Sequence, residues 1–194
     1  MPSDPLILAF DTSTAHCAAA LLLGQTVLVA RAEDMGRGQG ERLVPLLHEV
    51  LAQAGHGWGD LGRIAVGVGP GNFTGIRISV ATARGLGLAL GIPVLGVSTF
   101  QAIRTHSPGA RAAVSAPRDQ VYLQASPHDT PQLLAASAAG APLVFPPDPA
   151  QLCIAMARAA AQMPADAPAP APLYIRAADA APARDLPPVI LDDA

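Results

Sequence analysis

The sequence predicts an α/β protein with two unequal halves. Short apolar runs that are typical of buried strands alternate with segments in which apolar residues recur at helical spacing. Beyond residue 106 the helical pattern weakens, and short strand-like runs and a Pro/Ala-rich stretch follow. We therefore divide the 194 residues into an N-terminal lobe, 1–105, and a smaller C-terminal lobe, 106–194, which includes the Pro/Ala linker and the tail.

Composition narrows the class of protein. The chain is 51% hydrophobic and 4% aromatic, and it lacks the run of about 20 apolar residues that a membrane helix needs. No basic segment precedes the first apolar run, so we expect no signal peptide, no membrane association and a cytoplasmic location. Cys17 and Cys153 are too few for a disulfide framework or a zinc site, and we interpret them as buried thiols.

The net charge of −3 gives the chain no general attraction to nucleic acid. The charge is uneven, because residues 61–118 hold six arginines and no acidic residue. These arginines either lie scattered over the surface, which we favour, or form one basic face that would suit an RNA-binding module.

Three antiparallel strands are expected first. An unbroken apolar run, 6–10, predicts a strand buried on both faces. Only Gly24 and Gln25 separate the apolar segments 17–23 and 26–33, and this spacing predicts a tight hairpin.

Two helices then dominate the N-terminal lobe. The first, 41–54, has apolar residues at helical spacing that form one wide face. This face includes Leu43, Leu46, Leu47 and Val50. The second, 73–90, follows a strand at 64–69 and has a row of small residues that recur every four positions. The row includes Gly75, Ser79, Ala83 and Gly87. Because this row has almost no side-chain bulk, it predicts that another helix packs closely against it.

The remaining elements are shorter. A strand at 94–97 and a helix at 100–106, capped by Ser98 and Thr99, complete the first lobe. The second lobe is expected to contain strands at 111–116 and 120–125, an Ala-rich helix at 149–163, an extended linker at 164–172 and a short strand-like run at 173–176.

Two loops carry residue types that can bind a phosphate. The turn 69–74 follows a strand and opens a helix, where backbone N–H groups and the helix dipole can receive an anion. The polar turn 11–14 offers a carboxylate for a hydrated cation. The candidate residues are Asp11, Thr12, Ser13, Thr14, Gly69, Gly71 and Thr74. In the structural alternative, the glycines permit close packing of strand and helix, and the aspartate satisfies N–H groups of its own turn.

Residues suited to catalysis are few. The five histidines include no pair at the spacing of metal ligands on a helix. The chain has only three glutamates, and no serine lies in a nucleophile elbow. We therefore predict no catalytic residue and no metal site.

Several segments resemble the TsaB family. They read ILAFDTST (7–14), ERLVPLLHEVL (41–51), GVGPGNFTGIRIS (67–79) and GIPVLGVSTF (91–100), and PLYIRAADAAP near the end adds to them. The signature G-P-G-[ST]-F-T-G-[IV]-R is specific to this family and its catalytic paralogue. Asn72 is the one departure from it in this chain.

The resemblance implies an actin-like (ASKHA) fold of two RNase-H-like lobes, the second small and degenerate. TsaB proteins are non-catalytic subunits in the synthesis of threonylcarbamoyladenosine next to the tRNA anticodon. They bind the TsaD transferase and the TsaE ATPase, pair with a second copy when TsaD is absent, and reach tRNA only through the assembled complex. ATP and metal are expected on the partner subunits, so no cofactor is expected here. The paralogue's metal-binding histidines would follow strand 94–97, where this chain reads GVSTFQAI.

In the family, the two helices of the first lobe contact TsaD. The resemblance therefore points to the wide apolar face and the small-residue row as the partner interface, and the alternative is that both merely cover the sheet. The second hypothesis for function is an ATP-binding enzyme or ATPase of the actin-like superfamily, which would use the two phosphate-type loops. One departure weakens it: the second half of family members usually opens with Asp-Ala-Arg, where this chain has Ser115, Ala116 and Pro117.

Overall fold

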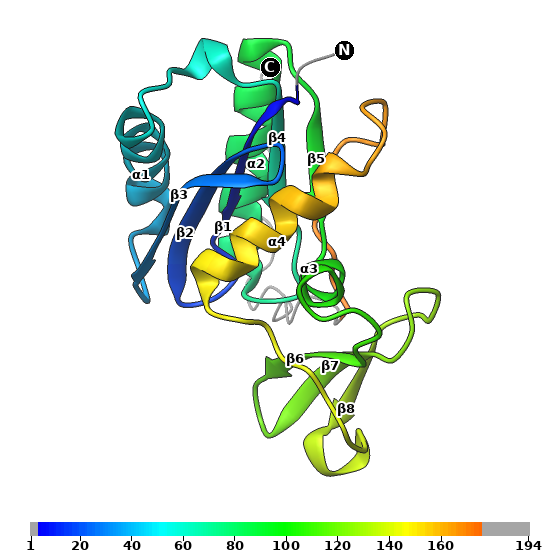
Figure 1. Cartoon of the computed structure of the whole chain (residues 1–194). Coiled ribbons are helices and arrows are strands. Elements are labelled where there is room, and N and C mark those ends of the chain that lie inside the picture. Colours follow the sequence, from blue (N-terminus) through cyan, green and yellow to red (C-terminus); the bar gives the residue numbers. More distant parts are fainter. Residues whose placement is uncertain (1–3, 176–194) are drawn as a thin grey trace, which may run out of the picture.

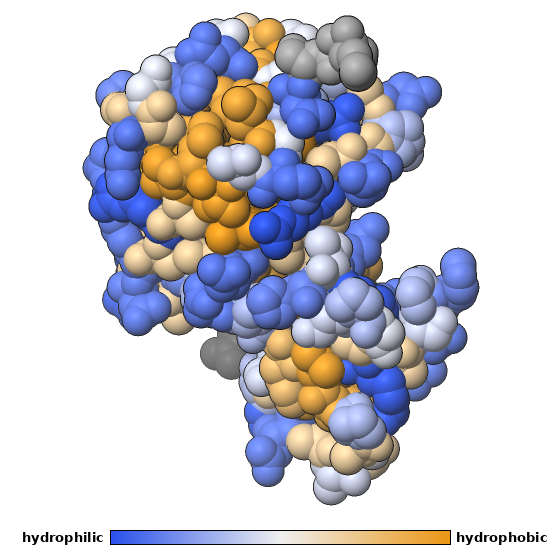
Figure 2. Space-filling view, viewed as in Figure 1, coloured by the Kyte–Doolittle hydropathy of each residue, from blue (hydrophilic) through white to orange (hydrophobic). Residues whose placement is uncertain are grey.

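The computed structural model describes residues 4–175 and confirms the α/β class. Figure 1 shows a larger lobe around a five-stranded sheet and a smaller lobe with three strands. The space-filling view in Figure 2 shows a narrower waist between the two lobes. Within the described residues, no helix has the length and apolar character needed to cross a membrane.

The larger lobe is built on a mixed sheet with the strand order β3-β2-β1-β4-β5. Its strands are β1 (Leu6–Asp11), β2 (His16–Leu23), β3 (Thr26–Asp34), β4 (Arg63–Gly67) and β5 (Val94–Val97). β2 is antiparallel to β1 and β3, whereas β1, β4 and β5 run parallel. The predicted hairpin is confirmed, and Gly24 at its turn has the positive φ of 58° that such turns favour. The order and directions are those of an RNase-H-like lobe, as the resemblance implies.

Helices cover both faces of this sheet (Figure 1). α1 (Gln39–Gln53) and α2 (Phe73–Leu90) pack on one face, where Leu8 and Phe10 of β1 join their apolar side chains. α3 (Thr99–His106) and α4 (Pro149–Ala161) pack on the other face, against Ile7 and Ala9 of the same strand. The alternation along β1 confirms a strand that is buried on both faces.

The smaller lobe contains the antiparallel strands β6 (Ala112–Ala116), β7 (Gln120–Gln124) and β8 (Gln132–Ala135). The sequence pattern predicts the first two strands but not β8, because its four residues carry only two large apolar side chains, both partly buried. Arg118 and Asp119 form the turn between β6 and β7 with φ of 62° and 57°, so two non-glycine residues adopt the left-handed conformation there.

α4 does not belong to the smaller lobe, although the sequence-based boundary placed residues 106–194 together. Its buried residues pack on the five-stranded sheet. Arg63, at the start of β4, donates from Nη1 to the carbonyl oxygens of Ala160 (2.8 Å) and Met163 (2.9 Å), at the C-terminal end of α4. The chain therefore leaves the larger lobe after α3 and returns to it at α4.

The segment after α4 is not a free linker. Pro170 is buried against Gly96, and the backbone N–H of Leu173 donates to the carbonyl oxygen of Val68 at 2.8 Å. The Leu173 side chain packs against the core beneath α1 and α2 and also against the core between α3 and β6. The predicted strand at 173–176 does not form over residues 173–175, and Arg176 lies outside the described residues.

Candidate functional site

The two phosphate-type loops lie against each other. The N–H of Asn72 donates to the carbonyl oxygen of Ser13 (2.6 Å), and the Thr12 hydroxyl donates to the carbonyl oxygen of Gly75 (2.7 Å). A side-chain carbon at Gly71 or Gly75 would overlap the backbone oxygens of Ser13 and Thr12. These two glycines therefore serve close packing of loop against helix, which was the structural alternative for this turn.

Asp11 is held in a buried hydrogen-bond network. Its Oδ2 accepts from the backbone N–H of Ser13 (3.0 Å) and from the Ser13 hydroxyl (2.8 Å). Nε2 of His16 lies 2.7 Å from the same oxygen, and Nδ1 of His16 lies 2.6 Å from the Thr14 hydroxyl. Asp11 is 1% exposed and His16 is 5% exposed. The carboxylate thus stabilises its own turn, and His16 is a partner that the sequence analysis did not assign to it.

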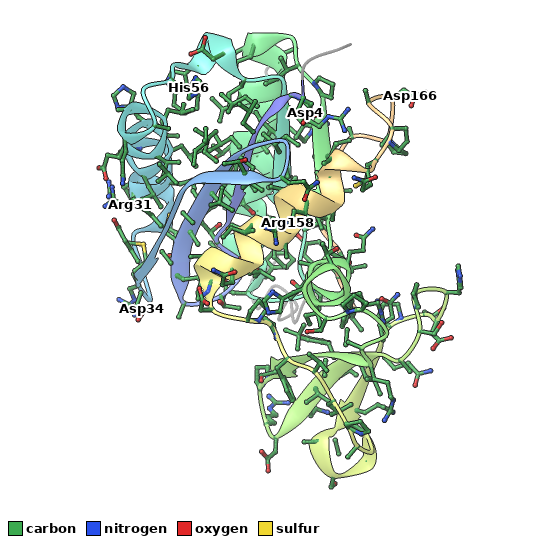
Figure 3. All side chains as sticks on the ribbon, in the orientation of Figure 1. Asp4, Arg31, Asp34, His56, Arg158 and Asp166 are labelled. Carbon is green, nitrogen blue, oxygen red and sulfur yellow. The ribbon has the colours of Figure 1, made fainter. Side chains whose placement is uncertain are left out.

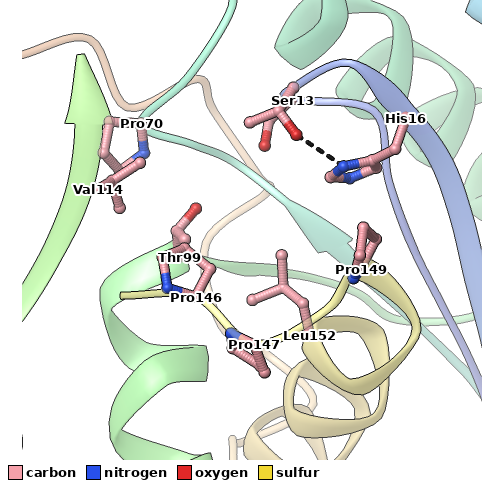
Figure 4. Close-up of a pocket in the computed structure, with 10 residues that line it drawn as sticks. Ser13, His16, Pro70, Thr99, Val114, Pro146, Pro147, Pro149 and Leu152 are labelled. Atoms are coloured by element: carbon pink, nitrogen blue, oxygen red, sulfur yellow. Dashed lines mark hydrogen bonds between the residues drawn. The ribbon is translucent and has the colours of Figure 1, made fainter. Parts of the chain in front are cut away.

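The loops border an open cleft between the lobes, with a volume of about 840 Å³. Of the seven candidate residues, Ser13, Thr14, Gly71 and Thr74 line this cleft, whereas Asp11, Thr12 and Gly69 are buried behind it. The N-terminal ends of α1 and α2 and the side chain of Tyr122 also face the cleft. Figure 4 shows a smaller adjoining pocket, of about 100 Å³, between His16 and Leu152. Within the described residues, no group of three or more potential ligands is arranged to hold a metal ion.

The structure corrects the predicted helix-pair interface. Leu43, Leu46, Leu47 and Val50 are fully buried against the sheet, and Gly75, Ser79, Ala83 and Gly87 are buried as well. The small-residue row approaches strands and a loop rather than another helix, since the Ser79 hydroxyl donates to the carbonyl oxygen of Gly67 (3.2 Å) and a side-chain carbon at Gly87 would overlap Val94. A partner cannot touch these side chains while the chain keeps its fold.

The solvent-facing sides of α1 and α2 carry a different set of residues. They are Glu41, Val44, Pro45, His48 and Ala52 of α1, and Arg77, Ala81, Arg84 and Leu88 of α2. We call these nine residues the outer face. Leu88 is 87% exposed and Val44 is 45% exposed, so two large apolar side chains stand in solvent there. Exposed apolar groups among small and charged neighbours are typical of protein interfaces.

Three of the six arginines in residues 61–118 make hydrogen bonds to the backbone within the fold. Arg63, Arg104 and Arg111 donate to backbone carbonyl oxygens and hold elements together. Elsewhere, Arg42 binds Glu33 and Glu49, both at 2.6 Å, and Arg31, labelled beside α1 in Figure 3, binds Glu49 at 2.8 Å. Arg63, Arg104 and Arg111 therefore have contacts within the fold, and whether the six arginines of residues 61–118 form one basic face stays an open expectation of the sequence.

Residues 33–143 match the family model of TsaD, tRNA N6-adenosine threonylcarbamoyltransferase. The chain is 35% identical over 122 residues to the tRNA threonylcarbamoyladenosine biosynthesis protein TsaB of Escherichia coli, covering 60% of this chain and 52% of that protein. It is 33% identical over 120 residues to the protein of the same name from Bacillus subtilis, covering 60% and 52%. The chain belongs to the TsaB family.

The solved structures agree with this membership. This TsaB-family chain matches YeaZ from Pseudomonas aeruginosa with a TM-score of 0.60 and 32% identity, covering 71% of this chain and 70% of that one. A second structure from Pseudomonas aeruginosa, described as an uncharacterized protein with similarity to peptidase YEAZ, matches with a TM-score of 0.69 and 26% identity, covering 89% and 100%. The chain spans about half the length of the curated relatives it matches.

Proposed function

We propose that this chain is a non-catalytic subunit in tRNA threonylcarbamoyladenosine biosynthesis, which docks onto a TsaD-type transferase and activates it. The observation that carries the proposal is the family membership, because the matched relatives bear that biosynthetic name. The thin inventory of catalytic side chains in the sequence supports a role as scaffold rather than as transferase.

The docking surface in this proposal is the outer face. It combines exposed apolar residues, Val44 and Leu88, with the small Ala81 and the charged Glu41 and Arg84. Two helices that lie side by side on a sheet can pack against two helices of a partner. The same face would support a homodimer when the transferase is absent, since a two-fold axis lets one patch meet its own copy.

Further parts of the proposal follow the family. A TsaE-type ATPase would join the assembly, ATP and metal would be held by the partner subunits, and tRNA would be reached only through the complex. The site of action would be the cytoplasm. None of these steps requires a catalytic group on this chain.

The functional test is the threonylcarbamoyladenosine content of tRNA, measured by mass spectrometry of hydrolysed nucleosides. In the source organism, deletion of this chain without a paralogue should abolish the modified nucleoside, and the wild-type chain should restore it. Complementation by Ala138→Trp, an exposed site on the smaller lobe, should also succeed, whereas Ala81→Trp on the outer face should fail. Modified tRNA in the deletion strain would disprove the proposed function.

The second candidate, an ATP-binding enzyme or ATPase, has the cleft in its favour, because Ser13, Thr14, Gly71 and Thr74 face it at the N-terminal end of α2. The Asp11 carboxylate argues against ATP binding, because its Oδ2 already accepts a hydrogen bond from the Ser13 hydroxyl and lies within hydrogen-bond distance of His16. Calorimetry with millimolar Mg-ATP distinguishes the ATP-binding enzyme from the non-catalytic subunit. Binding that Asp11→Ala abolishes would support the enzyme, and absence of binding would remove it.

A further inference from the structure

Arg77 on the outer face is held by two aromatic rings. The rings of Phe73 and Tyr174 are stacked, with centroids 4.8 Å apart. The guanidinium carbon of Arg77 lies 3.7 Å from the centroid of the Phe73 ring, and its Nε donates to the Tyr174 hydroxyl at 2.9 Å. Tyr174 comes from the segment after α4, so two parts of the chain nearly a hundred residues apart fix one side chain.

This arrangement orders an exposed guanidinium before any partner arrives. Stacking on an aromatic face restrains the side chain, and the hydrogen bond uses only Nε. Among the described residues, Nη1 and Nη2 of Arg77 donate to no protein atom. An arginine normally loses considerable rotamer freedom on binding, so an arginine that is already ordered binds at a lower entropic cost.

We infer that Arg77 is a preformed receptor for a carboxylate on the protein partner that docks on the outer face, and this inference rests on the proposed function. The two nitrogens Nη1 and Nη2 match the two oxygens of a carboxylate in a bidentate pair. Phe73 and Tyr174 are positioning residues, because they act on the partner through Arg77.

Arg77 has no acidic neighbour on its own helix. No residue between 61 and 118 is acidic, so α2 offers Arg77 no carboxylate of its own. Arg77, Ala81, Arg84 and Leu88 lie along one exposed stripe of α2. Ordered arginine and aromatic side chains beside exposed apolar groups are the composition of protein binding hot spots.

A protein carboxylate fits better here than a nucleic-acid phosphate. The two arginines of the stripe are separated by two helical turns with small and apolar residues between and beyond them, which is not a continuous basic track. The chain as a whole carries a charge of −3, which disfavours a polyanion.

The test is the dissociation constant for the TsaD-type subunit of the same organism, measured by calorimetry. Arg77→Lys keeps the charge but loses the planar fork, and we expect it to weaken binding at least tenfold. Arg77→Gln should weaken binding at least as much. Arg158→Gln, at an exposed arginine of α4 that lies outside the outer face, is the matched control and should weaken binding by no more than about threefold. Circular dichroism verifies that each variant folds.

Tyr174→Phe tests the positioning role. It keeps the stacked ring and removes only the hydroxyl that binds Nε, so we expect a several-fold loss of affinity in the wild-type background and none in the Arg77→Lys background. A merely structural role for Tyr174 would give the same loss in both backgrounds and would overturn this part of the inference.

The outcomes separate the two proposals. If the wild-type chain binds the transferase and Arg77→Lys and Arg77→Gln bind equally well, the inference is wrong and the proposed function stands. If the wild-type chain does not bind at all, the proposed function fails and the inference fails with it. Salt-sensitive binding of the isolated chain to tRNA that Arg77→Gln removes would assign Arg77 to phosphate and would contradict the inference of a carboxylate.

Discussion

At the scale of single residues, the arginines have roles that their sequence neighbours do not reveal. Arg63 caps a helix whose carbonyl oxygens lie about a hundred positions away, Arg42 joins two glutamates, and Arg77 lies on an aromatic ring. These partners become neighbours only when the sheet and helices are assembled. The burial of Cys17 and Cys153 could be predicted from their apolar surroundings, and the structure confirms it.

The ion pairs around Arg42 predict a dependence of stability on pH. Hydrogen bonding to Arg42 lowers the pKa of Glu49 from its usual 4.5 to about 2 in the folded protein. The unfolded chain therefore binds more protons than the folded one between these values, and stability falls as the pH falls. The contribution of Glu49 is fully present above pH 4.5 and is lost on approaching pH 2.

Urea unfolding of wild type and Glu49→Gln at a series of pH values measures this contribution. The difference in unfolding free energy between the two proteins should shrink as the pH decreases from 4.5 toward 2. Glu41→Gln removes a carboxylate of the same helix that forms no ion pair within the described residues, and it should show a smaller pH-dependent difference. A Glu49→Gln difference that stays constant with pH would contradict the prediction.

The turn between β6 and β7 predicts a stabilising substitution. Arg118 adopts φ of 62°, which costs a residue with a side-chain carbon about 1 to 2 kcal/mol. Arg118→Gly removes this conformational cost in the folded protein. Glycine also raises the conformational entropy of the unfolded chain, which opposes folding, so we expect a net stabilisation of about 0.5 to 1 kcal/mol. Arg118→Ala retains the strain and serves as the control in thermal unfolding. A destabilised Arg118→Gly would show that the Arg118 side chain itself contributes.

At the scale of elements, each of the four α-helices in the described residues corresponds to a segment that the sequence predicts as a helix, from apolar spacing for α1 and from small residues, capping residues or Ala content for the others. The spacing shows that α1 and α2 each bury one side, but it does not show what lies against that side. The small-residue row of α2 contacts Gly67, Val94 and the loop around Thr12. The spacing of apolar residues in the sequence does not indicate which backbone segments such a row will contact. The nearness of the two phosphate-type loops is easier to expect, since both follow adjacent parallel strands, β1 and β4.

The two sides of α2 predict opposite results for two neighbouring substitutions. Ala83 is fully buried, so Ala83→Trp should destabilise the fold by about 3 kcal/mol or more through overpacking. Ala81 is exposed, and Ala81→Trp should change the unfolding free energy by less than about 0.5 kcal/mol. Chemical denaturation of both variants checks this. Equal effects would mean that α2 turns a different side toward the sheet.

At the scale of the whole molecule, the sequence predicts two unequal lobes but not the path of the chain between them. α4 returns to the larger lobe, and Leu173 contacts the cores on both sides of the waist. Neither feature could be predicted, because an Ala-rich helix and a Pro/Ala segment carry no local signal for the surface they cover. The actin-like fold could be predicted only from the family resemblance. The candidate interface that the sequence predicts is buried in the core, so the structure leaves the outer face as the candidate.

The central claim is that the outer face binds the transferase, and the most direct measurement is the solution mass by light scattering. The purified chain is measured alone and mixed with the TsaD-type subunit of the same organism. We expect a stable one-to-one complex with the wild type and with Ala138→Trp, and none with Ala81→Trp, which keeps its fold. A complex that forms equally well with Ala81→Trp, or no complex with the wild type under any nucleotide condition, would contradict the claim.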